Sequence, residues 1–318
     1  MFRSSTRQSK YVPPSGLITC PQAMTRSVKF VFNEEDEPAA AKTISLLKGQ
    51  PQHVSLVKKA NAAAAALAGV KLSGLLCEVI LLMDTSASMN WAGREYYIAR
   101  KGQRAPIYQL LERVLGWALN VDANGTVPVI RYGGRVADPV DITADNYLQA
   151  EQLLQPIWGG TPMTEAFQKA MALAAKNDKM TIIFNLTDGD PNSKPSMDNA
   201  VIGSSTGPVM LKNLALNEVP YLEELDDMPS LWEIRKDAND KPVLDGDEMI
   251  ILDKNTSTDH QTAPRRFIDN VDSKSVDPFN DTDEVFAAKM TDEIGTLLEV
   301  WGRTGILTGV PGVERTIF

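Results

Sequence analysis

The sequence is poor in cysteine, histidine and long apolar runs, and each shortage excludes a class of protein. Its 318 residues include only two cysteines, Cys20 and Cys77, which cannot build a disulfide framework and fit a reducing compartment. No stretch approaches the roughly 18 apolar residues of a membrane helix, and the N-terminus lacks the apolar core of a signal peptide. We therefore expect a cytoplasmic protein that neither spans a membrane nor is secreted by a recognisable signal.

Positive charge is also scarce. The chain has 32 Lys and Arg against 41 Asp and Glu, a net charge of -9. A surface of this sign repels the phosphate backbone, so general nucleic-acid binding is not expected. The charge is uneven, because residues 1–33 contain bases and no acid whereas residues 221–299 are rich in acids. This asymmetry suggests contacts within or between chains, although two solvated surfaces of opposite sign would give the same pattern.

Continuous apolar runs predict the central strands. Runs at 78–83, 127–132 and 180–186 are typical of parallel strands that are buried on both faces, and 208–216 and 266–271 are weaker strand candidates. Helical patterns follow or separate them at 57–67, 107–119, 145–154, 164–175, 219–225 and 283–301. Strands that alternate with helices predict an α/β fold, with a doubly wound, mostly parallel sheet flanked by helices.

The same patterns divide the chain into three parts. Residues 1–50 form a basic arm and extension, in which 27–32 could make one short strand. Residues 51–302 form the α/β domain, interrupted at about 229–264 by an insertion that is expected to contain a hairpin. Residues 303–318 form a C-terminal tail. Both terminal segments lack the pattern of a packed element, so we expect them to become ordered on binding.

Polar motifs stand at three ends of these elements. Asp84-Thr85-Ser86-Ala87-Ser88 follows the first apolar run, Gly159-Gly160-Thr161-Pro162 precedes a helix, and Thr187-Asp188-Gly189-Asp190 follows the third run. Ligands of an open parallel sheet bind at the carboxyl ends of its strands. The motifs offer oxygen ligands only, which favours Mg²⁺, with Mn²⁺ or Ca²⁺ as alternatives, over zinc. The predicted ligands are Asp84, Ser86, Ser88, Thr161 and Asp188.

Each motif also has a simpler explanation. The first could be a turn that caps the next helix, Thr161 could be a helix N-cap, and Asp188-Gly189-Asp190 could be only a turn. Their joint occurrence favours one cation site. Hydroxyl ligands are neutral, so the ion would keep part of its charge and accept an Asp or Glu carboxylate from a protein partner.

These three motifs resemble the metal-ion-dependent adhesion site, or MIDAS, of von Willebrand factor type A (vWA) domains. In that family's pattern the positions of Ser86 and Ser88 bind the ion directly, Thr161 binds it directly or through water, and Asp84 and Asp188 act mainly through water. The resemblance implies a vWA fold. It also implies a non-enzymatic module for divalent-cation-dependent protein–protein interaction.

A narrower resemblance is to the TerF-like, tellurium-resistance subgroup. It covers residues 50–302, and with the MIDAS motifs it is carried by four segments: His53–Lys59, Leu111–Leu115, Leu222–Met228 and Phe267–Val271. The subgroup's name implies a role in stress resistance. Similar domains occur in phage-encoded proteins, which implies a virion-associated location as the alternative.

Further residues and functions remain open at the level of sequence. Trp91, Arg94 and Asp190 are candidates for a partner-binding rim around the ion. One alternative function is a structural component of a larger assembly, such as a phage particle, docked through the N-terminal arm and C-terminal tail. Another is a Mg²⁺-dependent phosphoryl-transfer enzyme with Asp84 as nucleophile. Such an enzyme would resemble the haloacid-dehalogenase-like phosphatases, whose pattern has a second aspartate two positions on as general acid, and it is disfavoured because that residue here is Ser86.

Overall fold

A mostly parallel sheet organises the protein. The computed structural model describes residues 28–31, 44–91, 94–122, 124–239, 241–245, 249–255, 265–310 and 313. Within them, the largest sheet has six strands, and β3 (Val127–Tyr132) and β4 (Val140–Ile142) are its one antiparallel pair. In spatial order the strands are β10 (Val271–Ser275), β6 (Val209–Ala215), β5 (Thr181–Thr187), β2 (Glu78–Asp84), β3 (Val127–Tyr132) and β4 (Val140–Ile142).

The central strands form where the sequence is continuously apolar. In β5 and β6 every residue is buried, and in β2 only Glu78 is partly exposed. Such strands need cover on both faces, which the connecting helices supply. β2 and β5 are neighbours in register, with Met83 opposite Leu186. The residues that follow β2 and β5 therefore lie side by side.

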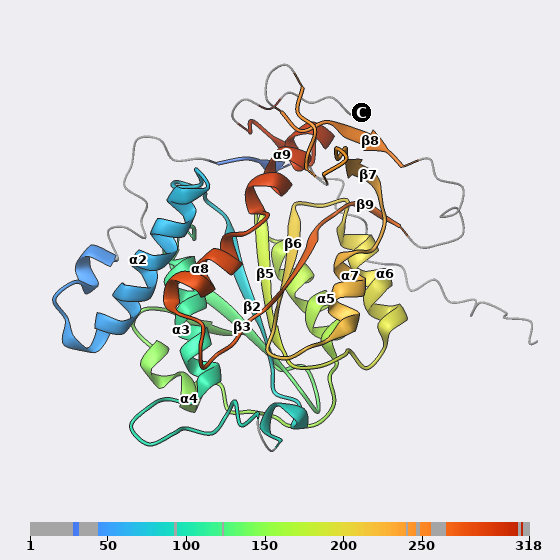
Figure 1. Cartoon of the computed structure of the whole chain (residues 1–318). Helices are drawn as coiled ribbons and strands as arrows, with labels where there is room; N and C mark the ends of the chain where they lie inside the picture. Colours follow the sequence, from blue (N-terminus) through green and yellow to red (C-terminus); the bar gives the residue numbers. More distant parts are fainter. Residues whose placement is uncertain are drawn as a thin grey trace, which may run out of the picture.

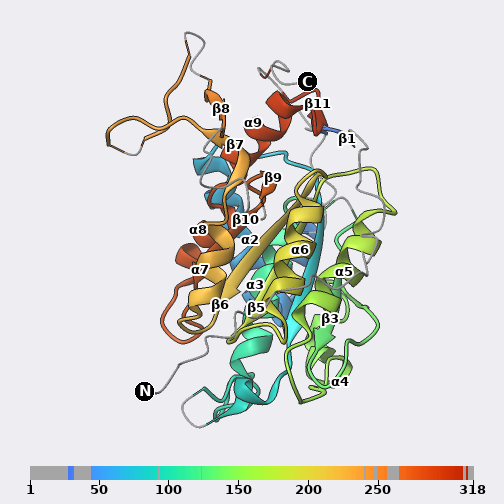
Figure 2. The same ribbon diagram turned by 90° about the vertical axis from the view of Figure 1, so that its right-hand side faces the viewer.

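Two helical layers cover the sheet (Figure 1). One face carries α2 (Val54–Gly69), α3 (Pro106–Ala118) and α8 (Asp283–Thr291), and the other carries α5 (Met163–Ala174), α6 (Lys194–Ser204) and α7 (Pro220–Asp226). Figure 1 shows the strands between the two layers, and Figure 2 looks onto the layer that contains α5, α6 and α7. The predicted α/β class, with a mostly parallel sheet flanked by helices, is confirmed.

A smaller sheet lies at the end of the molecule opposite the residues that follow β2 (Figures 1 and 2). It contains β7 (Ser230–Ile234), β8 (Leu252–Lys254) and β9 (Arg266–Ile268). β7 and β8 are antiparallel, as expected of the inserted hairpin. At the same end, β1 (Val28–Lys29) pairs with β11 (Leu307–Thr308), so the N-terminal extension meets the C-terminal segment within one chain.

The single strand predicted at 266–271 was wrong. It is two strands: β9 pairs with β7 in the small sheet, whereas β10 pairs with β6 in the large one. Asn270 fixes the change of direction, because its side-chain amide donates to Ser204 Oγ at 2.9 Å and to the Val209 carbonyl at 3.2 Å. These partners are distant in sequence, so a local pattern does not reveal the break.

The single helix predicted at 283–301 was also wrong. It is divided into α8 and α9 (Ile294–Thr304) by Glu293, whose φ is +62°. Lys274 holds the break, with Nζ 2.8 Å from Asp292 Oδ2 and 2.9 Å from Glu293 Oε1. Tertiary ion pairs thus override local helix propensity here.

Shorter elements account for the remaining differences. The helix predicted at 145–154 is a 3₁₀ helix, Tyr147–Gln149, followed by α4 (Ala150–Leu153). The prediction omitted α6 and β4. The strand expected at 27–32 is seen only as β1, and its first and last residues lie outside the described part, as do residues 1–27 of the arm. Among the described helices, none is both long and apolar enough to cross a membrane.

Candidate metal centre

Asp84 ends β2 in a fully buried position. Its Oδ1 accepts a hydrogen bond from the Ser86 amide at 2.7 Å, and its Oδ2 accepts one from Thr187 Oγ1 at 2.7 Å. The Tyr97 hydroxyl donates to the Asp84 carbonyl at 2.6 Å. The Asp84 carbonyl and both carboxylate oxygens are therefore held in place.

A row of hydroxyl groups connects this strand end to the next one. Ser86 Oγ lies 2.9 Å from Ser88 Oγ, and Ser88 Oγ donates to Asp188 Oδ1 at 2.8 Å. Asp188 directly follows β5, the neighbour of β2. Four of the five predicted ligands, Asp84, Ser86, Ser88 and Asp188, are thus brought together at the carboxyl ends of adjacent strands, where ligands of open α/β sheets bind.

The loop that carries Thr161 contacts the serine loop through its backbone. The Ala87 amide donates to the Gly159 carbonyl at 3.0 Å, which places the Gly159–Thr161 segment against the serine loop. Asn192 holds Thr161 from the other side. Its Oδ1 accepts from the Thr161 backbone amide at 2.8 Å, and its backbone amide donates to the Thr161 carbonyl at 2.9 Å.

Glycine is required at position 159, where the loop that carries Thr161 packs against the loop after β3. Gly159 has φ of +134°, and a Cβ there would lie 2.4 Å from the Cα of Gly134. Only glycine allows both this backbone conformation and this approach. The Gly-Gly-Thr-Pro motif therefore does more than begin a helix, because its first residue lets the Thr161 segment pack against the loop after β3.

The electrostatics of the centre favour a cation. Burial raises the pKa of Asp84 to about 6, and the nearby Asp188 carboxylate also raises it, whereas the hydrogen bonds from Thr187 and Ser86 lower it. The charged form of Asp84 is thus costly without a counter-charge. Two carboxylates and three hydroxyls form a hard, oxygen-only donor set, which fits Mg²⁺, Mn²⁺ or Ca²⁺.

The three predicted rim residues have different surroundings. Trp91 is 62% exposed, as a contact surface would be. Asp190 pairs with Lys194 at 2.9 Å, with both side chains about half exposed. Arg94 reaches into the centre, where its Nη1 lies 2.7 Å from Asp188 Oδ2. The sequence did not predict this ion pair.

Three supporting residues were also missed: Thr187, Tyr97 and Asn192. Thr187 could have been found, because it stands just before Asp188 on a strand adjacent to β2 and its side chain faces Asp84. Tyr97 and Asn192 lie in loops with no periodic pattern, and only the tertiary structure brings them to the centre.

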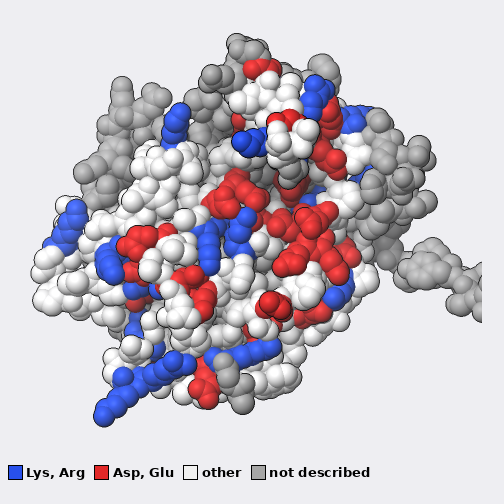
Figure 3. All heavy atoms as spheres, viewed as in Figure 1, with Lys and Arg blue, Asp and Glu red and all other residues white. Residues whose placement is uncertain are grey.

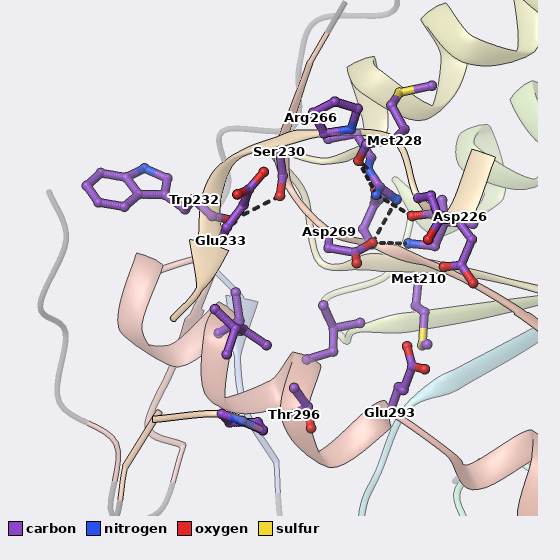
Figure 4. Close-up of a pocket in the computed structure, with 18 of the residues that line it drawn as sticks. Met210, Asp226, Met228, Ser230, Trp232, Glu233, Arg266, Asp269, Glu293 and Thr296 are labelled. Atoms are coloured by element: carbon purple, nitrogen blue, oxygen red, sulfur yellow. Dashed lines mark hydrogen bonds and ion pairs between the residues drawn. The ribbon is translucent and has the colours of Figure 1, made fainter. Parts of the chain in front are cut away.

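A second acidic group lies at the other end of the molecule. Ligand atoms of Asp226, Asp272 and Glu293 fall within 4.8 Å of one another, and a hollow of about 590 Å³ opens beside Asp226 and Glu293 (Figure 4). Lys212 pairs with Asp272 in the interior, and Lys274 Nζ lies 3.2 Å from Asp272 Oδ1 and 2.9 Å from Glu293 Oε1. Figure 3 likewise shows basic among acidic side chains on this face. Lysines already pair with two of these three acids, Asp272 and Glu293, so the group is a poorer cation site.

Comparisons with solved structures show distant similarity. The conserved hypothetical protein BatB from Bacteroides thetaiotaomicron is 17% identical with a TM-score of 0.39, covering 68% of this chain and 97% of that one. The manganese-loaded TRAP protein of Plasmodium vivax is 14% identical with a TM-score of 0.32, covering 45% of this chain and 58% of that one. No curated protein sequence matches the chain.

A family match gives the assignment. The model of the vWA-TerF-like family, described as the vWA found in the TerF C terminus, matches residues 76–240. This range contains all three polar motifs. Domains of the vWA type commonly bind protein partners and are often involved in metal-dependent interactions. Because the match spans more than half of the sequence, the chain belongs to the vWA-TerF-like family.

Proposed function

We propose that Asp84, Ser86, Ser88, Thr161 and Asp188 bind one divalent cation, and that an Asp or Glu carboxylate of a protein partner completes its coordination. The observation that carries this proposal is the row of contacts from Ser86 through Ser88 to Asp188. It aligns neutral hydroxyls between two strand-end carboxylates. Mg²⁺ is the expected ion, with Mn²⁺ or Ca²⁺ as substitutes, because all the donors are oxygen atoms.

The residues have distinct tasks in this function. Ser86 and Ser88 offer neutral ligands, and the two aspartates supply charge close to the ion and hold its water ligands. Thr161 lies on a loop fixed by Asn192, so it can approach the ion from a third side. Because the aspartates would act mainly through water, the direct protein ligands would all be neutral hydroxyls and would leave an excess of positive charge on the ion itself. That excess attracts the partner's carboxylate.

We infer that the centre binds rather than catalyses. A phosphoryl-transfer enzyme of the kind considered above would need an acid two positions after Asp84, and that residue is Ser86. His53 contacts a residue outside the centre, with its Nδ1 3.2 Å from the Tyr147 hydroxyl, and His260 is outside the described residues. We propose a cytoplasmic module in a stress response of the tellurium-resistance type. A virion-associated component is the alternative if the chain is phage-encoded.

Calorimetric titration with MgCl₂ and MnCl₂ tests the cation site directly. The wild-type chain should bind one ion, and Asp84→Ala and Thr161→Ala should abolish or strongly weaken binding. Asp253→Ala is a matched control, because Asp253 is an exposed carboxylate that pairs with Arg235 in the small sheet. It should bind like the wild type. Wild-type protein that takes up neither ion would refute the proposal.

Partner recognition is tested separately. Immobilised wild-type protein should retain its partner in Mg²⁺ and release it in EDTA, and Thr161→Ala should not retain it. Replacing each exposed Asp or Glu of the captured partner should identify the carboxylate that reaches the ion. Retention that EDTA leaves unchanged would contradict a cation-dependent interface, even if the chain binds the ion.

A further inference from the structure

Arg94 places a positive charge on one of the predicted ligands. Its guanidinium Nη1 lies 2.7 Å from Asp188 Oδ2, while Ser88 Oγ donates to Asp188 Oδ1 at 2.8 Å. The Asp188 side chain is fully buried and that of Arg94 is 31% exposed. Both oxygens of Asp188 are therefore occupied by donors of the chain itself. A charge-assisted bond of this length is among the stronger polar contacts of a protein.

We propose that Arg94 is an internal competitor of the divalent cation: its guanidinium occupies Asp188 in the cation-free protein and leaves when the cation binds. This inference rests on the proposed function. A guanidinium and a divalent ion at the same carboxylate would repel each other at short range, where solvent screens little because Asp188 is buried. Arg94 therefore lowers the affinity for the cation.

The local structure lets the Arg94 side chain move without unfolding the site. The segment is anchored just after Arg94 by two tyrosines. The Tyr96 hydroxyl donates to the Leu216 carbonyl at 2.6 Å, and the Tyr97 hydroxyl donates to the Asp84 carbonyl at 2.6 Å. Arg94 is partly exposed, so its side chain can turn toward solvent while these anchors remain. The competition is then a side-chain exchange at Asp188 and leaves the strand ends in place.

Calorimetric titration of the full chain with MnCl₂ measures this competition. Arg94→Gln removes the charge and should bind Mn²⁺ about tenfold more tightly than the wild type, as expected for the loss of one close charge-assisted contact. Arg135→Gln removes the same charge from an exposed position on the loop after β3 and should change the affinity less than about twofold. The difference between the two variants separates direct competition from a general effect of charge.

Arginine labelling with phenylglyoxal, read by mass spectrometry, measures release of the guanidinium. In the wild type, Arg94 should be labelled faster with Mn²⁺ present than without it, while Arg135 should be labelled at the same rate. Equal Mn²⁺ affinities of wild type and Arg94→Gln, or unchanged labelling of Arg94, would overturn this inference and leave the cation site standing. If neither wild type nor Arg94→Gln binds Mn²⁺, the proposed function fails, and this inference with it.

Discussion

Replacing Asp84 by asparagine should stabilise the cation-free protein while removing its function. The pKa of Asp84 is raised to about 6 from its ordinary value of 3.8, chiefly by burial. At about 1.4 kcal/mol per pH unit, that difference makes the charged form cost about 3 kcal/mol of folding stability at pH 7.5. Asparagine carries no charge. Its oxygen can still accept from the Ser86 amide, and its NH₂ can donate to Thr187 Oγ1.

The pH dependence has a definite sign. Because the pKa of Asp84 is higher in the folded protein than in the unfolded chain, the folded protein binds more protons between pH 6 and 3.8. The Asp84 contribution therefore makes the wild type relatively more stable as the pH falls through this window. The advantage of Asp84→Asn should be about 3 kcal/mol at pH 7.5 and about 1 kcal/mol at pH 4.5.

Urea denaturation in EDTA, followed by circular dichroism at several pH values, measures this difference. Adding Mg²⁺ should stabilise only the wild type, by about 2.7 kcal/mol at a hundred times the dissociation constant, and so remove most of the advantage. Asp122→Asn is the contrasting variant, because the same change there should stabilise the protein less than Asp84→Asn does. Asp122 is also buried, but it accepts from two backbone amides, Val79 N and Asn124 N, and asparagine can satisfy only one of them. An Asp84→Asn variant that is less stable than wild type in EDTA at pH 7.5 would refute the reasoning.

Two further comparisons, each between a pair of variants, test the framework of the fold. Gly159→Ala should destabilise the protein by about 3 kcal/mol and weaken Mg²⁺ binding, because the added Cβ would meet the backbone of Gly134. Gly189→Ala is the control. Its added Cβ has no atom within 4 Å, so its stability should stay within about 1 kcal/mol of wild type. Urea denaturation and calorimetry measure both effects; equal losses would contradict the packing argument. Lys212→Met should cost about 3 kcal/mol, since it leaves the fully buried Asp272 without its nearest counter-charge, and a second change, Asp272→Asn, should recover part of the loss in the same denaturation assay. A Lys212→Met variant as stable as the wild type would show that the Lys212–Asp272 ion pair makes no net contribution to folding stability.

The sequence predicted the elements whose signal is local. Continuous apolar runs identified β2, β5 and β6, because a strand covered on both faces has no polar side. α6 was missed since its faces differ little in polarity. Its start did carry a signal: Ser193, whose side chain accepts from the Ser196 amide, is followed two positions later by a proline.

The predicted ligands could be chosen from the sequence because they stand at strand and helix ends, where parallel topology brings them together. Arg94 could not. Its contact with Asp188 spans 94 positions and depends on how the loop anchored by Tyr96 folds back over the strand ends. Charge on a loop residue gives no information about which of many carboxylates it will reach.

The pairing of β1 with β11 determines how the protein can be tethered. Val28 and Leu307 lie side by side, and Figure 2 places this pair beside α9, at the end away from the loops that follow β2 and β5. A support or larger body joined through either end of the described chain would hold the molecule from that side. The predicted cation site would then point away from the attachment, so that a body joined directly at Val28 or Leu307 leaves it free to meet a partner in solution.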